Sequence, residues 1–228
     1  MAPRVLIVDN AAHRFLLKPA WHWKAHLKGV ETVTVNVPSG RPIPPLGRFT
    51  HVLLTGSDAS ILDPKPWFAT ESELIGEVVR RGIPILGSCF GHEMLVYALS
   101  GRAHLRRADP PEIGWANVEM VEPDPLFAGL PTPWSAFVFH FGEVVDPPPP
   151  WRTLGRTPQC ATHVLRYGDR PVWGIQAHPE ISSRKAKLFL RATLLLGLRP
   201  VHQIVRALRN IPPRNDVAET IVRRFLAR

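Results

Sequence analysis

The stretch ILGSCFGHEML, residues 85–95, decides how this chain folds. A short apolar strand pattern runs into Gly-x-Cys-x-Gly and then directly into a helical pattern that ends before Gly101. This arrangement is typical of a strand-to-helix elbow, here with Cys89 in the nucleophile position. Gly87 and Gly91 carry no Cβ where a tight turn brings strand and helix together. The stretch therefore predicts a thiol at the carboxyl end of a sheet.

Short apolar runs alternate with helical patterns in the first half of the chain. The strand pattern at 30–37 alternates apolar and polar residues, which is expected near a sheet edge. Alternation of strands and helices predicts an α/β domain with a mostly parallel sheet flanked by helices. The predicted strands are 5–8, 30–37, 51–54 and 83–86, and the predicted helices are 14–28, interrupted near Pro19, and 67–81, stopped at Gly82.

The second half of the chain shows another pattern. Short β-like runs at 116–121, 136–141, 161–167 and 172–176 are separated by turn-rich segments, including four prolines at 147–150. These runs predict an antiparallel β segment appended to the parallel core. From Ser183 onward the apolar spacing is helical, which predicts C-terminal helices.

Composition and charge limit the class of protein. With 228 residues, 45% of them apolar, the chain suits one core, and two cysteines are too few for a disulfide framework. Neither a long apolar run nor a signal-like segment is present, so we expect a soluble cytoplasmic protein without membrane association.

The net charge of +9 is concentrated at one end of the chain. Residues 1–183 carry 17 Lys and Arg and 17 Asp and Glu, whereas residues 184–228 carry 11 and 2. The body of the protein is therefore not expected to bind nucleic acid. We favour solvated Arg faces on the tail helices, and the alternative is docking to an acidic partner or to RNA.

The candidate base lies in the stretch GIQAHPE, residues 174–180. Residues i and i+2 of an extended segment point to the same side, so Glu180 is predicted to orient one nitrogen of His178 while the other faces Cys89. Pro179 keeps His178 out of the helical region. The helix N-terminus after Cys89 favours a thiolate, and the backbone N–H groups of Phe90 and Gly56 are predicted to bind an oxyanion.

Together these motifs resemble the class I glutamine amidotransferases, which have a Cys-His-Glu triad. The similar segments are 87–92 and 176–180, and 56–60, 112–115 and 139–142 are similar to stand-alone members related to the glutaminase half of GMP synthetase. The resemblance covers about residues 5–190. It implies a flavodoxin-like sheet, with residues 1–198 as the amidotransferase-like domain and 199–228 as a basic helical extension.

The resemblance also implies a mechanism and a substrate site. Cys89 attacks the γ-carbonyl of glutamine, His178 protonates the leaving ammonia, and water hydrolyses the γ-glutamyl thioester. Gly56 and Phe90 supply the oxyanion hole by the same analogy. The residues implied to bind substrate or to organise its loop are Ser57, Glu93, His140, Phe141 and Gly142.

Three positions depart from the family pattern. Glu93 stands where the family commonly has Gln, and a carboxylate there would repel the carboxylate of glutamine. Ala177 replaces a residue that is commonly aromatic, and His163 stands where relatives often carry Gln. These departures keep open a γ-glutamyl peptidase, as well as a weakly active regulatory or binding subunit whose basic tail docks a partner.

No cofactor and no metal site are expected. His22 and His26 are four residues apart, but no third ligand is apparent and the neighbouring tryptophans favour packing. The chain has no ATP-binding signature, so an ammonia acceptor would belong to a synthetase partner acting in trans.

Overall fold

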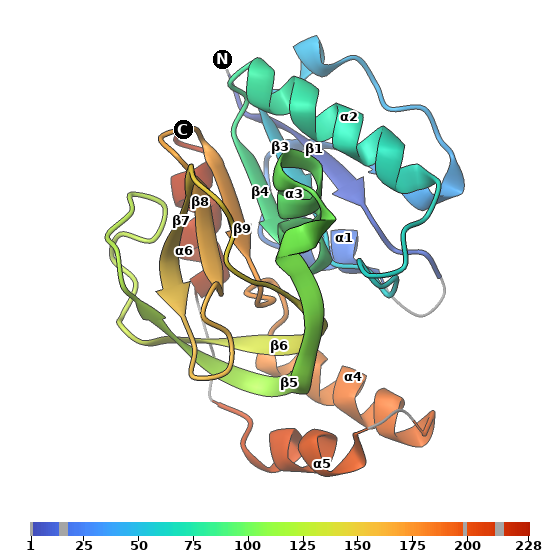
Figure 1. The fold of residues 1–228 in the computed structure, drawn as a ribbon, viewed down its shortest axis with the longest axis vertical. Coiled ribbons are helices and arrows are strands. Elements are labelled where there is room, and N and C mark those ends of the chain that lie inside the picture. The colour runs from blue at the N-terminus through green and yellow to red at the C-terminus, as the bar shows by residue number, and fades with distance from the viewer. Residues whose placement is uncertain (1, 14–17, 198–199, 213–216) are drawn as a thin grey trace.

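A single mixed sheet forms the centre of the protein. The structure is a computed structural model that describes residues 2–13, 18–197, 200–212 and 217–228. Within these residues the strand order is β2-β1-β3-β4-β9-β8-β7-β5-β6 (Figure 1). The strands are β1 (Arg4–Asp9), β2 (Glu31–Asn36), β3 (His51–Leu54), β4 (Ile85–Ser88), β5 (Leu105–Met120), β6 (Trp134–Val144), β7 (Trp151–Arg156), β8 (Val164–Tyr167) and β9 (Val172–Ile175).

The sheet has a parallel half and an antiparallel half. β2, β1, β3, β4 and β9 pair in parallel, whereas β9–β8, β8–β7, β7–β5 and β5–β6 are antiparallel. Figure 1 shows β5 and β6 turned across the lower end of the other strands. The carboxyl ends of the parallel strands face this hairpin, so residues at those ends meet residues of β6.

Helices cover both faces of the parallel half. Leu6 and Val8 of β1 belong to the apolar cluster under α2 and α3, whereas Val5 and Ile7 belong to the cluster under α1 and α6. This division follows from the alternation of side chains along a strand buried on both faces. The helices are α1 (Pro19–Lys24), α2 (Trp67–Arg80), α3 (Phe90–Ser100), α4 (Ser183–Leu195), α5 (Val201–Arg209) and α6 (Val217–Phe225), with short 3₁₀ turns at Val37–Ser39, Leu46–Arg48 and Arg102–His104.

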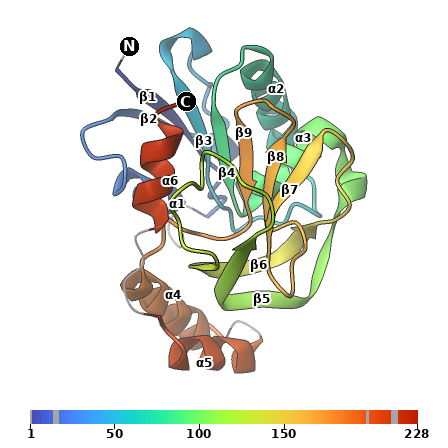
Figure 2. The same ribbon diagram turned by 90° about the vertical axis from the view of Figure 1, so that its left-hand side faces the viewer.

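Helices α4 and α5 pack against the β5–β6 hairpin. Phe137 of β6, Leu190 of α4 and Ile204 of α5 form a third apolar cluster there. Figure 2 shows both helices below the sheet, apart from α6, which lies along it. In the described part of the chain, no helix combines the length and apolar character needed to cross a bilayer.

The predictions for the first half are largely confirmed. β2 lies at the sheet edge as expected, and α2 ends at Arg80, one residue before the predicted end and two before Gly82, whose φ is +69°. β4 begins at Ile85 rather than at residue 83. Residues 14–17 of the predicted first helix lie outside the described residues, and the helix that follows ends at Lys24 rather than at residue 28.

The second half requires corrections. The prediction that residues 172–176 belong to the appended antiparallel strands is wrong in part: β9 (Val172–Ile175) pairs antiparallel with β8, but it also pairs in parallel with β4 and so joins the two halves. All four residues of β9 are buried, so apolar and polar residues do not alternate along it, and the sequence pattern does not indicate which strands it pairs with. The sequence does not predict β7, and β5 begins at Leu105, eleven residues before the predicted strand. The predicted boundary at 198/199 lies outside the described residues, although α6 beyond it packs its Phe225 ring against Trp173.

Candidate active site

The elbow at Cys89 has the predicted strand-to-helix geometry. β4 ends at Ser88, α3 begins at Phe90, and Cys89 between them has φ +50° and ψ −111°. A non-glycine residue in this region of backbone space is strained, and such strain concentrates at functional sites. The N–H of Cys89 donates to the carbonyl of Ile175 at 2.8 Å, so the elbow is bonded to β9.

Both glycines of the elbow are required by close packing. A Cβ on Gly87 would lie 2.4 Å from the carbonyl oxygen of Gly91. A Cβ on Gly91 would lie 2.7 Å from the carbonyl oxygen of Leu54 at the end of β3. Backbone atoms cannot move aside as side chains do, so these positions exclude larger residues.

His178 and Glu180 follow β9 and bond to each other. His178 Nδ1 donates to Glu180 Oε1 at 2.8 Å, and both residues are buried. The backbone N–H of His178 donates to the carbonyl of Phe137 at 2.7 Å, which attaches this segment to β6. Because Nδ1 carries the proton in this bond, Nε2 is the nitrogen left to face a thiol.

The pKa of His178 reflects its two neighbours. Burial lowers the pKa, but the Cys89 sulfur and the Glu180 carboxylate act in the other direction and raise it well above its ordinary value. The thiol of Cys89 is also hydrogen-bonded to the imidazole. A thiolate beside an imidazolium is the pairing that makes cysteine nucleophilic at neutral pH.

Gly56 lies against both reactive groups. A Cβ on Gly56 would come within 2.8 Å of His178 Cε1 and 3.7 Å of Cys89 Cβ. Phe90 buries its ring against Trp67, while its backbone N–H lies in the first turn of α3, where no intrahelical acceptor exists. The backbone of residues 56 and 90 therefore flanks the sulfur.

Glu93 is a buried carboxyl beside the elbow. Gln176 Nε2 donates to Glu93 Oε1 at 3.1 Å, and a Cβ on Gly142 would lie 3.0 Å from the same oxygen. Burial raises the pKa of Glu93 to about 7, although His140 and Gln176 act in the other direction. Glu93 is therefore divided between its neutral and ionised forms near neutral pH.

The other predicted substrate residues have different surroundings. The Ser57 hydroxyl donates to the carbonyl of Asn10 and accepts from the N–H of Ala59, so its hydrogen bonds join the loop after β3 to the residue that follows β1. His140 is buried, and its Nδ1 donates to the carbonyl of Gly142 at 2.8 Å. Phe141 is 39% exposed.

A small cavity of about 70 Å³ lies beside His178. Phe137 and Phe139 of β6 and Phe189 of α4 supply apolar walls, and His22 and Lys185 supply polar ones. Burial lowers the pKa of His22 to about 4, so its ring is neutral at pH 7. The sequence did not predict this cavity, because its walls come from elements that are distant along the chain.

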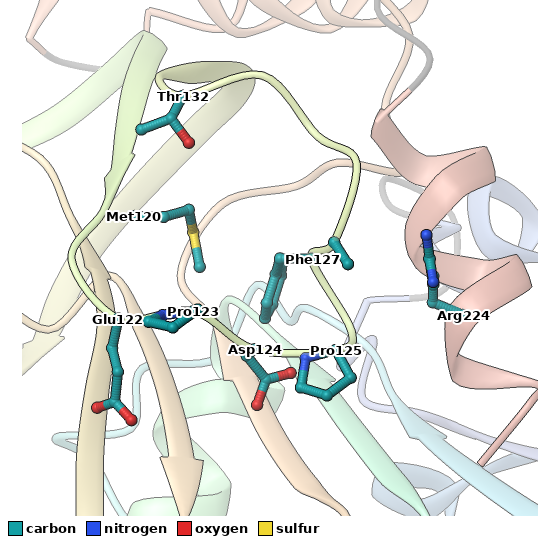
Figure 3. A pocket seen from close by; sticks show the side chains of 9 residues that line it. Met120, Glu122, Pro123, Asp124, Pro125, Phe127, Thr132 and Arg224 are labelled. Carbon is teal, nitrogen blue, oxygen red and sulfur yellow. The ribbon is translucent and has the colours of Figure 1, made fainter.

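A larger hollow, of about 500 Å³, lies away from the elbow. It is bordered by the connection between β5 and β6 and by Arg224 of α6 (Figure 3). Its buried Asp124 bonds to Arg166 and Trp173, which uses both of its carboxylate oxygens. The described residues that line it include neither cysteine nor histidine, so they offer no group for thiol chemistry.

One polar residue of the site was missed by sequence analysis. Gln176 belongs to the GIQAHPE stretch and bonds to Glu93, but the sequence pattern alone assigned it no role. Gln176 and His178 are two positions apart, and side chains at that spacing share a face in extended chain. That spacing was the available signal.

The fold is that of known glutamine amidotransferases. A glutamine amidotransferase of Thermotoga maritima superposes with a TM-score of 0.78 and 24% identity, covering 99% of this chain and 97% of that one. A glutamine amidotransferase of Methylobacillus flagellatus also gives 0.78, at 20% identity, covering 100% and 95%.

The sequence places the chain in a family. The family model for glutamine amidotransferase class-I matches residues 43–195, and the chain belongs to this family. The GMP synthase (glutamine-hydrolyzing) of Aeropyrum pernix is 32% identical over 136 residues, which cover 60% of this chain and 25% of that protein. One subunit of the Pyrococcus abyssi GMP synthase (glutamine-hydrolyzing) is 31% identical over 100 residues, covering 44% and 52%. The chain thus spans a quarter to a half of these relatives.

Proposed function

We propose that the protein hydrolyses the γ-amide of glutamine through a γ-glutamyl thioester on Cys89. The observation that carries this proposal is the position of the His178 imidazole, bonded through one nitrogen to Glu180 and facing Cys89 with the other. The strained elbow and the lack of space for a side chain at Gly56 support it, because both leave backbone N–H groups, rather than side chains, close to the sulfur.

The chemistry runs in two halves. The thiolate of Cys89 attacks the γ-carbonyl, and the N–H groups of Phe90 and Gly56 receive the developing oxyanion. His178 gives its proton to the leaving nitrogen, so ammonia departs and a thioester remains. His178 then takes a proton from water, the hydroxide attacks the thioester, and glutamate leaves as the thiolate reforms.

The use of the ammonia is proposed to lie outside this chain. Both relatives are named as glutamine-hydrolyzing GMP synthases, and the Pyrococcus abyssi protein is named as one subunit of such an enzyme. We therefore propose a synthetase partner in trans. The strand order β2-β1-β3-β4-β9 in the parallel half supports the flavodoxin-like description of the domain that would deliver the ammonia.

A second candidate function is γ-glutamyl peptidase, which would use the same triad on a γ-glutamyl amide with a larger leaving group. One observation favours it. The cavity beside His178 has three aromatic walls, which suit an apolar leaving group better than ammonia.

A substrate panel separates the two functions. The purified protein is incubated with glutamine and with γ-glutamyl dipeptides that differ only in the second residue, and free glutamate and ammonia are followed. Ammonia release from glutamine, absent in Cys89→Ala, supports the first proposal. Faster glutamate release from dipeptides with apolar second residues supports the second, and Phe189→Ala should reduce it without affecting glutamine. Turnover of neither substrate contradicts both proposals.

A further inference from the structure

Three buried side chains, two from strands and one from the residue before a third strand, converge beside the candidate active site. Glu112 of β5 lies opposite His140 of β6 in the strand register, and His163 directly precedes β8. Glu112 Oε2 lies 2.9 Å from His140 Nε2 and 3.6 Å from His163 Nε2. One donor atom from each residue lies within 4.8 Å of the others.

The hydrogen bonds of His140 require a positive charge between its Nε2 and the carboxylate of Glu112. Its Nδ1 faces the carbonyl of Gly142, which only accepts, so Nδ1 carries a proton. Its Nε2 faces the carboxylate of Glu112, which also accepts when ionised. A neutral imidazole would therefore oppose two lone pairs, and a cation, either a second proton or a metal ion, has to lie between Nε2 and the carboxylate.

The surroundings of His163 favour a metal ion over a proton as this cation. Its side chain is fully buried, and among the described residues neither of its ring nitrogens has a hydrogen-bond partner. The 3.6 Å separation from Glu112 is too long for a hydrogen bond. A proton on His140 would leave His163 unsatisfied, which is costly for a buried polar group. Ligand atoms around tetrahedral Zn²⁺, with bonds of about 2.0–2.1 Å, lie about 3.3 Å apart, between the two separations observed.

The surrounding contacts are those that hold metal ligands in place. The Gly142 carbonyl fixes the tautomer of His140, and Thr157 Oγ1 donates to the second oxygen of Glu112 at 3.0 Å. Such outer contacts orient ligating imidazoles and carboxylates in metal sites. Two nitrogen donors and one carboxylate suit Zn²⁺, whereas Ca²⁺ and Mg²⁺ prefer oxygen.

We propose that Glu112, His140 and His163 bind a Zn²⁺ ion that joins β5, β6 and the start of β8. The ion would join these segments without taking part in the proposed thiol chemistry, since all three ligands are buried and Cys89 is not among them; a water molecule would be its fourth ligand. It would fix Gly142 against Glu93, and so hold one wall of the candidate substrate site. This proposal does not depend on which γ-glutamyl compound the protein uses.

Zinc content of the untagged protein tests the proposal. Protein produced with added zinc and dialysed against metal-free buffer should retain about one equivalent of Zn²⁺, measured by mass spectrometry of the metal. His163→Gln and Glu112→Gln should weaken binding about 100-fold or more, read by titrating the metal-free proteins with Co²⁺ and following its visible absorption bands. His202→Gln is the matched control, because His202 is exposed on α5. It should bind Co²⁺ as the wild type does.

Two results would overturn the assignment. One is a wild-type protein that retains less than about a tenth of an equivalent of zinc and shows no tetrahedral Co²⁺ spectrum. The other is unchanged binding in a folded His163→Gln or Glu112→Gln variant. X-ray absorption at the zinc edge of the wild type decides independently of whether the variants fold: two imidazoles and no sulfur are expected, and a sulfur ligand would place the ion elsewhere.

Discussion

The parallel and antiparallel halves of the sheet contribute different things to the candidate site. The parallel half carries the groups proposed to do chemistry, since Cys89 follows β4 and His178 follows β9. The antiparallel half carries the walls, since Phe137, Phe139 and Gly142 all belong to β6. The difference predicts that the reaction type depends on the parallel half, whereas selectivity depends on the walls from β6 together with Glu93 of α3.

The largest expected effect on activity comes from replacing Cys89 in the parallel half, compared with replacing Cys160 in the antiparallel half. Cys89→Ala should lower kcat/KM for the better substrate at least about 1000-fold, because the nucleophile is lost. Cys160→Ala is the matched control: Cys160 is also buried, but lies before β8, and burial raises its pKa to about 12. Its loss should change activity less than about threefold, measured by steady-state kinetics. Comparable activity in the two variants would favour a binding or regulatory role over catalysis.

The next effect concerns the elbow. Gly91→Ala should destabilise the fold by about 3 kcal/mol, because its Cβ would meet the carbonyl of Leu54 at 2.7 Å. Gly76→Ala in α2, where no atom lies within 4 Å of the new Cβ, should instead stabilise the fold by about 0.5–1 kcal/mol. Urea unfolding of both variants measures the contrast. Equal and small effects would mean that the elbow is looser than its geometry indicates.

Glu71 of α2 is a buried carboxyl in the parallel half that the proposed chemistry does not use, and it should make the stability of the fold depend on pH. Burial raises the pKa of Glu71 to about 8 from 4.5, although Asn10 donates to one of its oxygens. Because the folded pKa exceeds the unfolded one, its stabilising contribution is complete below pH 4.5 and is lost as pH rises toward 8. Glu71→Gln keeps an acceptor for Asn10 and should gain about 3 kcal/mol over the wild type between pH 5 and pH 8. A constant difference across this range, in thermal unfolding, would contradict the assignment.

The smallest effect concerns selectivity. Glu93→Gln should lower KM for glutamine about tenfold at pH 8, because an ionised carboxylate near the substrate carboxylate is removed. The gain should shrink below pH 7, where Glu93 is protonated in the wild type. Glu73→Gln, at an exposed carboxylate on α2, is the control and should leave KM unchanged. A pH-independent KM in the wild type would show that Glu93 does not face the substrate.

The parallel half of the sheet could be predicted from the sequence more completely than the antiparallel half. The elbow, the pairing of His178 with Glu180 and the parallel strands 5–8 and 51–54 are local patterns, and each was readable from a few neighbouring residues. Gly87 and Gly91 were readable because only glycine fits such a turn.

The antiparallel half depended on distant pairings. β7 has no clear alternation, and the direction of β9 is set by its pairing with β4, which lies far earlier in the chain. The aromatic cavity and the cluster of Glu112 with His140 and His163 join segments whose proximity no local pattern encodes. Tertiary packing, rather than propensity, decides such contacts.

Labelling with a diazoketone analogue of glutamine tests the central proposal most directly, because the reagent alkylates the group that attacks the γ-carbonyl. The analogue should modify one residue per chain, mapped by peptide mass spectrometry to Cys89, with loss of activity and protection by substrate. Modification of Cys160 or another residue, or full activity after Cys89 has been labelled, would contradict the account.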